Sequence, residues 1–219
     1  MFCIENAKDR VNEFVRIIDT TSKDLVVQAG LRQHEALAKI NSTSVNTFRI
    51  LSMLRRDGSV KVYSSIVRMG MHGSRVDNAS SGGITCGIDE TGRLKDVAYS
   101  AAGEKYLEHP DSKVKFSEIV IPQFSDCLAF VKSLHCQIPH FRLVSWDVAV
   151  DEMGRPVLIE SNMRWGELDF HQLNNGPLFG EDLPQILNEV FGPTAGRRAG
   201  IVLRMFKRMF KILSGVWLQ

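Results

Sequence analysis

Alternating apolar and polar positions along the chain predict a sheet of consecutive strands. The runs are rich in β-branched and aromatic residues and are separated by turn residues, as in antiparallel hairpins. Arg55-Arg-Asp-Gly58, for example, indicates a tight turn between two such runs. The ranges predicted as strands are 24–30, 46–54, 60–69, 84–88, 94–99, 143–150 and 157–162.

Apolar residues at helical spacing occupy three stretches between and around the strands. They predict helices over 5–20, 122–135 and 182–191, with a shorter helical turn within 31–40. The interval 103–119 shows neither period and is expected to be irregular. The predicted fold class is α+β, a mostly antiparallel sheet with packed helices. We expect one domain over 1–192, followed by a separate C-terminal segment, 193–219.

One predicted hairpin, 143–162, carries polar residues on one of its faces. The hypothesis is a register in which Val150 pairs with Val157, and Asp147 then lies opposite Glu160. Directly opposed residues share a face of the sheet. The polar face would hold Ser145, Asp147, Glu160 and Asn162, and the core face would hold Trp146, Val148, Val150, Val157 and Ile159.

Two ionised carboxylates in directly opposed positions repel each other, since their Cβ atoms lie about 5 Å apart. A hard divalent cation between them relieves the repulsion, and Mg²⁺ accepts carboxylate and amide oxygens as ligands. We therefore interpret Asp147, Glu160 and Asn162 as candidate metal ligands. The alternative interpretation is a solvent-facing hairpin whose polar residues lie on its wet side.

Two arginines lie inside strand patterns, where an unpaired guanidinium would be costly. Arg49 and Arg68 fall on two strands of one predicted hairpin, and phosphate or carboxylate is the usual bidentate partner of such residues. A wet sheet face would also accommodate them. Residues 77–83 form a polar loop ending in Gly82 and Gly83, and such loops let backbone N–H groups approach anions.

Composition narrows the classes of function. Hydrophobic residues make up 44% and charged residues 24% of the chain, as in ordinary globular proteins. A net charge of +2, without a basic stripe interleaved with aromatics in the body of the chain, indicates no nucleic-acid partner. The four cysteines are widely spaced and are expected to be reduced, and the N-terminus has no signal-peptide pattern. The expected compartment is the cytoplasm.

Six segments, taken in order, form a recognisable set. They are Val26-Val-Gln-Ala29, Asn46-Thr-Phe-Arg49, Ile66-Val-Arg68, Val76-Asp-Asn-Ala-Ser-Ser-Gly-Gly83, Trp146-Asp-Val-Ala-Val150 and Val157-Leu-Ile-Glu-Ser-Asn162. In this order and spacing they resemble the ATP-grasp superfamily, and most closely its sugar-transfer-associated group. The resemblance covers roughly residues 10–185 and is more specific than any single segment.

The resemblance implies a role for each matching residue. In such enzymes ATP and Mg²⁺ convert a carboxylate to an acyl phosphate, which an amine, a thiol or a similar nucleophile then attacks. The implied substrates are a nucleotide and a small carboxylate or sugar-linked molecule, in surface-polysaccharide or cell-envelope biosynthesis. The implied residues are Val26, Gln28, Ala29, Gly82 and Gly83 for binding the nucleotide, Arg49, Arg68 and Asn78 for catalysis, and Asp147, Glu160 and Asn162 for the metal.

One part of the superfamily pattern has no counterpart here. A lysine and a glycine-rich loop normally precede the adenine-binding strand, but Gly30 is the first glycine of this chain. Three alternatives follow: a truncated ligase, a half that works with a separate N-terminal partner, or a non-catalytic remnant that acts as a binding or scaffold protein. A half-grasp would leave an apolar sheet face exposed, so self-association or a partner is expected.

The C-terminal segment combines apolar and basic residues at helical spacing. An amphipathic basic helix of this type binds the interface of anionic membranes. The alternative is a helix packed on its own domain or on a partner, with a solvated basic side. We therefore expect a cytoplasmic protein that contacts the inner face of the membrane peripherally through residues 195–219. The cations on the predicted polar face are Arg204, Lys207, Arg208 and Lys211.

Overall fold

The computed structural model describes residues 11–20, 29–78, 81–164 and 166–192. The chain divides into two compact units, Met1–Leu31 and Arg32–Gln219, which are described separately. The first unit contains α1 (Val11–Thr20), which lies inside the helix predicted over 5–20. The predictions for Val26, Gln28 and the segment 195–219 fall outside the described residues.

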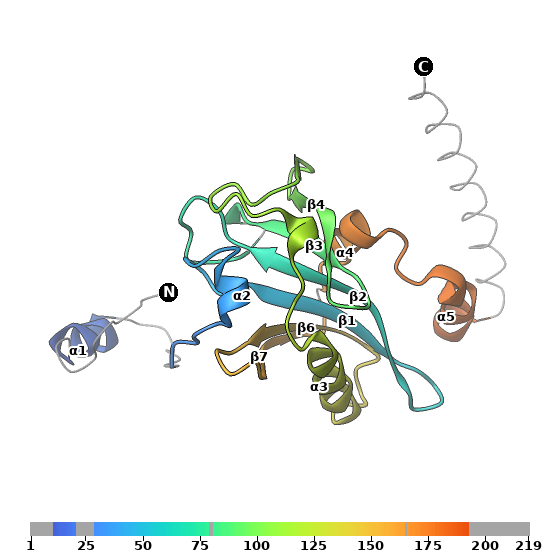
Figure 1. Ribbon diagram of the computed structural model, residues 1–219. Coiled ribbons are helices and arrows are strands. Elements are labelled where there is room, and N and C mark those ends of the chain that lie inside the picture. Colours follow the sequence, from blue (N-terminus) through green and yellow to red (C-terminus); the bar gives the residue numbers. More distant parts are fainter. Residues whose placement is uncertain (1–10, 21–28, 79–80, 165, 193–219) are drawn as a thin grey trace, which may run out of the picture. The chain divides into compact units, whose positions relative to one another are not determined.

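The second unit is built on one seven-stranded antiparallel sheet, in the order β5-β4-β3-β2-β1-β6-β7 (Figure 1). The first four strands follow one another as hairpins, and the chain then returns to place β6 beside β1. The α+β prediction is therefore confirmed. The strands are β1 (Thr47–Leu54), β2 (Val60–Met69), β3 (Ile84–Ile88), β4 (Leu94–Ser100), β5 (Lys105–Tyr106), β6 (Leu143–Val150) and β7 (Pro156–Asn162).

One face of the sheet forms the apolar core. Phe48 of β1 lies opposite Val148 of β6, and both side chains are fully buried. The helix α3 (Phe124–Cys136) covers this face, and the ring of Phe124 meets the ring of Phe48 edge-on, with centroids 6.4 Å apart. Burial of these side chains favours closing the two central strands against each other, because it removes apolar surface from water.

The opposite face is polar and is partly covered by α4 (Leu168–Asn175), a helix that the sequence pattern does not predict. This helix attaches by hydrogen bonds as well as by packing. The buried His171 ring lies 2.8 Å from the Ser64 hydroxyl of β2, and Asn174 donates to Thr85 of β3 at 2.8 Å. The other short helices described in this unit are α2 (Glu35–Ala38), η2 (Phe116–Glu118) and η3 (Gly180–Asp182).

The hairpin of β6 and β7 brings its two carboxylates directly opposite each other, as expected, although the predicted register is wrong. Val150 pairs with Pro156 rather than with Val157. A bulge adds one residue, Ile159, to β7 and restores the expected pairing beyond it. The prediction that Ile159 belongs to the core is also wrong: its side chain is 47% exposed, because β7 is an edge strand.

The described cysteines, Cys86, Cys127 and Cys136, are free thiols, as predicted. Burial raises the pKa of the Cys86 and Cys127 thiols to about 12, so both stay protonated at neutral pH. Within the described ranges, no helix is long and apolar enough to cross a membrane.

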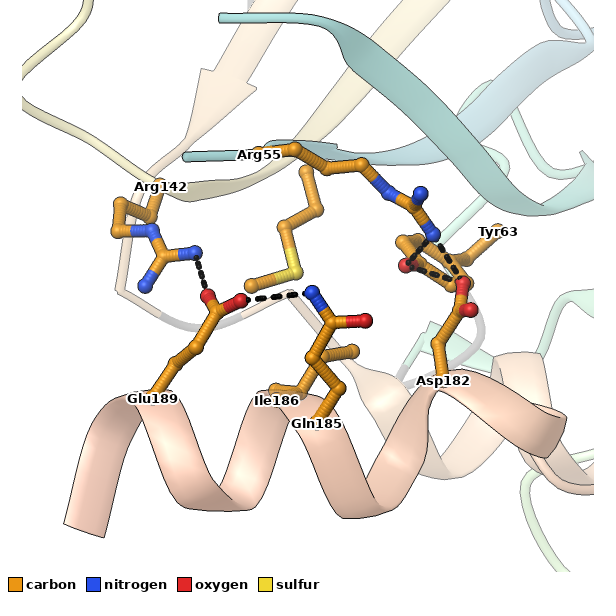
Figure 2. Close-up of a pocket in the computed structure, with 8 residues that line it drawn as sticks. Arg55, Tyr63, Arg142, Asp182, Gln185, Ile186 and Glu189 are labelled. Atoms are coloured by element: carbon orange, nitrogen blue, oxygen red, sulfur yellow. Dashed lines mark hydrogen bonds and ion pairs between the residues drawn. The ribbon is translucent and has the colours of Figure 1, made fainter. Parts of the chain in front are cut away.

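The last described helix, α5 (Leu183–Phe191), is attached to the strand ends by two carboxylates (Figure 2). Asp182 precedes the helix and Glu189 lies near its end, so the two contacts are about two turns apart. The partners are Lys61, Arg55 and Tyr63 for Asp182, and Arg142 for Glu189, with a distance of 2.7 Å from Lys61 Nζ and from Arg142 Nη2.

Low pH is expected to loosen the first of these contacts. The hydrogen bond from Lys61, and then that from Tyr63, lowers the pKa of Asp182 from 3.8 to about 2. A lowered pKa in the folded state contributes stability that is present above the unfolded-state value and lost as the pH falls through the folded-state value. Amide NMR spectra of α5 should therefore change as the pH falls from 3.8 towards 2. The Asp182→Asn variant should lack this change, and an equal change in both proteins would contradict the assignment.

Candidate functional site

Three charged side chains from neighbouring strands meet on the polar face. Arg49 of β1 lies opposite Asp147 of β6 and forms a bidentate pair with it, Nε to Oδ1 and Nη2 to Oδ2, both at 2.7 Å. Arg68 of β2 donates from Nη1 to the same Oδ2 at 2.9 Å. Burial lowers the pKa of Arg49, but the hydrogen bond and charge of Asp147 raise it, and the balance lies above the ordinary value. The anionic partner that both buried arginines require is therefore Asp147.

The loop between β2 and β3 closes over the second arginine. Arg68 Nη2 lies 3.2 Å from Asp77 Oδ1 and also donates to the side chain of Asn78. Asp77 in turn accepts from the backbone N–H of Thr47 at 3.3 Å and from the hydroxyl of the same residue. The loop is thereby tied to β1 and β2 together. Asn78, one of the predicted catalytic residues, contacts Arg68 directly.

Glycines allow this loop to fold back against the sheet. A Cβ on Gly83 would lie 2.6 Å from the carbonyl oxygen of Asp77 and 2.8 Å from that of Met69, closer than side-chain carbons come to backbone oxygens. Gly82 has φ +91°, in the left-handed region that favours glycine. The glycine pair predicted from the sequence thus shapes the loop, whatever it binds.

A third carboxylate, Glu167, joins the cluster, and sequence reasoning missed it. It lies between β7 and α4 and pairs with Arg49 Nη1. Its backbone is left-handed, with φ 49°, which is uncommon for a residue other than glycine. Ser145 of β6 donates to the carbonyl of Gly166 at 3.2 Å and so holds this connection against the sheet. No motif marks Glu167, because its contact depends on how the chain turns after the edge strand.

The imidazole of His171 adds no positive charge to this cluster. Burial, together with the nearby charge of Arg49, lowers the pKa of His171 to about 3, so the ring is neutral at physiological pH. Its two nitrogens face hydroxyl groups, Nδ1 the hydroxyl of Ser64 and Nε2 that of Ser145 at 3.5 Å. These contacts give His171 a structural role between β2, β6 and α4.

The two other predicted metal ligands lie on β7. Glu160, opposite Asp147, is exposed, and its carboxylate forms no hydrogen bond or ion pair with any described residue. Asn162 lies opposite Ser145, and its side-chain nitrogen is buried without a hydrogen-bond partner among the described residues. An amide presents either its oxygen or its nitrogen by rotating, so this side chain is free to turn its oxygen toward a ligand.

The donor set fits a divalent cation. Asp147 accepts three hydrogen bonds, and a carboxylate has about four acceptor positions, so one position on Oδ1 is open. The described residues contain no group of three or more His, Cys, Asp or Glu side chains suited to a metal, so the set depends on the amide of Asn162. The cluster has an excess of two negative charges, from Asp77, Asp147, Glu160 and Glu167 against Arg49 and Arg68.

Three of the residues predicted to bind the nucleotide belong to the first unit, Met1–Leu31. Val26 and Gln28 fall outside the described residues, and Ala29 belongs to the first unit. Gln33, which follows them in the chain, has a structural contact: its Oε1 accepts from the backbone and side chain of Asn46, both at 2.9 Å.

Comparison with known proteins gave one match. The family model described as sugar-transfer associated ATP-grasp matches residues 17–188, which is more than three quarters of the chain. The matched range contains every residue of the charged cluster, from Arg49 to Glu167. No curated protein and no solved structure matched the chain.

Proposed function

Because the chain belongs to the sugar-transfer associated ATP-grasp family, we propose that it is an ATP- and Mg²⁺-dependent carboxylate ligase-type protein in surface-polysaccharide or cell-envelope biosynthesis. The reaction class would be phosphorylation of a small or sugar-linked carboxylate to an acyl phosphate, followed by attack of an amine or a similar nucleophile. The nucleotide would bind over the polar face of the sheet.

The observation that supports this proposal most directly is the opposition of Asp147 and Glu160 beside two buried arginines. Carboxylates flanked by guanidinium groups are the elements that phosphoryl transfer needs, because charge develops on the phosphoryl oxygens. A sheet face built only for solubility would not bury both arginines, which are 4% exposed.

The side chains divide this work according to their environments. Glu160 and Asn162, which have no partners among the described residues, would hold the cation together with the open position on Asp147. When bound, Mg²⁺ neutralises charge on phosphate oxygens. Arg49 and Arg68 would orient the anionic group, and Asn78 would fix the position of the Arg68 guanidinium through the contact they already make.

A second candidate, a non-catalytic remnant that acts as a binding or scaffold protein, is favoured by one observation. Each guanidinium nitrogen of Arg49 already has a carboxylate partner. Of the buried nitrogens of the two arginines, only Nε of Arg68 has no hydrogen-bond partner among the described residues. Phosphate binding therefore requires the arginines to exchange partners, whereas a remnant would keep the arrangement as it stands.

Calorimetry with MgATP tests the metal assignment. We expect Glu160→Ala to weaken MgATP binding by about tenfold or more, because it removes a metal ligand. The fold should be unaffected, since this carboxylate forms no hydrogen bond or ion pair with another described residue. The matched control is Glu152→Ala, which removes another exposed carboxylate, from the turn of the same hairpin, and should bind like wild type.

Equal affinities for wild type and Glu160→Ala would remove the metal assignment. ADP release separates the two candidates: release with a carboxylate acceptor that is lost in Glu160→Ala would exclude the remnant. MgATP binding without ADP release, for acceptors of both the small and the sugar-linked kind, would favour it.

A further inference from the structure

The side chains by which α5 contacts the strand ends are mostly polar. Asp182, Gln185 and Glu189 are spaced so that they share one side of the helix. Figure 2 shows these side chains, with Ile186, pointing at the strand ends, where Arg55 and Arg142 meet the two carboxylates. Leu183, Ile186 and Leu187 of the same helix are half-buried.

The last turn of the same helix nevertheless leaves apolar side chains exposed. Leu183, Leu187 and Val190 follow the i, i+4, i+7 spacing of a second side, and Phe191 continues it. No residue of α5 is buried, and the exposed fraction rises to 55% at Val190 and 67% at Phe191. These two side chains form an exposed apolar pair at the point where the helix ends.

The sequence that follows this apolar pair is strongly basic. Residues 193–219 contain six Arg or Lys and no Asp or Glu, while the whole chain has 27 basic and 25 acidic residues. The remainder therefore has 21 basic and 25 acidic residues, a net charge of −4. A negatively charged surface would attract only this end of the protein and would repel the rest.

We propose that the C-terminal end of the domain binds an anionic lipid surface. Val190 and Phe191 would enter the boundary between headgroups and acyl chains, and the basic residues that follow would pair with anionic headgroups. The ion pairs at Asp182 and Glu189 attach the helix to the protein, and Val190 and Phe191 stay exposed at its end.

The mixture of residues favours lipid over nucleic acid as the partner. A nucleic acid would use the cations, but it would leave Val190 and Phe191 in water. The basic stretch also contains large apolar residues between its cations, which an acyl-chain boundary buries and a phosphate backbone does not. They include Met205, Phe206, Met209, Phe210 and Trp217.

Flotation of the full chain with lipid vesicles tests the proposal. The wild type should float with vesicles that contain phosphatidylglycerol and not with vesicles of phosphatidylcholine alone. Phe191→Ser should lower the bound fraction about threefold to tenfold, because a large apolar contact is lost. Replacing Arg204, Lys207, Arg208 and Lys211 together with Gln should lower it at least a hundredfold, because each cation near an anionic surface contributes about fivefold.

The control is Leu107→Ser, which removes an apolar side chain of equal exposure, 66%, from a loop elsewhere in the domain. It should float like wild type. Failure of the wild type to float with anionic vesicles would overturn the proposal, as would flotation of Phe191→Ser and the four-cation variant at the wild-type level. Gel-shift binding to RNA without vesicle binding would identify the other partner class. None of these outcomes bears on MgATP binding, which is measured separately.

Discussion

Replacing Asp147 with alanine is expected to destabilise the domain by about 3–5 kcal/mol, the largest loss for any single substitution in the site. Asp147 is the shared partner of Arg49 and Arg68, and all three are almost fully buried. Without the carboxylate, two guanidinium groups stay buried with part of their hydrogen bonding unsatisfied. Urea unfolding followed by circular dichroism measures the loss. Asp147→Asn, which keeps the shape and removes the charge, should also be clearly destabilised.

Glu160→Ala provides the contrast, because Glu160 lies directly opposite Asp147 but is exposed and has no partner among the described residues. It should change the free energy of unfolding by no more than about 0.5 kcal/mol. The two carboxylates would then differ in kind: one holds the fold and the site, and the other serves only the ligand. If Asp147→Ala unfolds like Glu160→Ala, the paired arginines contribute little and this division is wrong.

Replacing Gly83 with alanine is expected to cost about 1–3 kcal/mol by overpacking and to weaken MgATP binding as well. The new Cβ would lie under 3.0 Å from three backbone oxygens, those of Asp77, Met69 and Asn78. Backbone oxygens cannot swing away as a flexible side chain does, so the loop must move. Asp77 and Asn78 would move with it and leave Arg68, which they contact.

Gly30→Ala is the matched control, because a Cβ there meets nothing within 4 Å and the position has no left-handed backbone. It should unfold like wild type in urea. A Gly83→Ala protein of wild-type stability would show that the loop accommodates the added Cβ without strain. Lost stability with unchanged MgATP binding would separate the loop from the nucleotide.

The sequence was sufficient for most of the sheet. β2, β3 and β6 begin and end at the predicted residues, because each is an apolar or alternating run bounded by turn residues. The two hairpin carboxylates were placed opposite each other correctly, because the bulge at Ile159 cancels a register error of one residue. Bulges leave no periodic signal in the sequence. The pairing of Asp147 with Glu160 was therefore predicted correctly, although the bulge that produces it was not predicted.

Features that depend on distant contacts could not be predicted. α4 lacks a strong apolar stripe and is held partly by hydrogen bonds to strands about 90 to 110 residues earlier in the chain, so its periodicity gave no signal. Glu167 meets Arg49 across 118 positions. The pattern required an anion beside each arginine, but the identity of that anion depends on which strands become neighbours.

The neighbouring position of β1 and β6 also sets an order of assembly during synthesis. Arg49 and Asp147 are 98 positions apart, whereas the β1–β2 hairpin closes through a short turn. Local hairpins form within about 1–10 μs, and contacts between distant segments must wait for a much larger loop to close. Until β6 has emerged from the ribosome, Arg49 of the nascent chain therefore lacks its partner Asp147, and the edge of β1 stays unpaired. During that interval the unpaired edge of β1 is open to pairing with another chain, which is the general hazard of exposed strand edges.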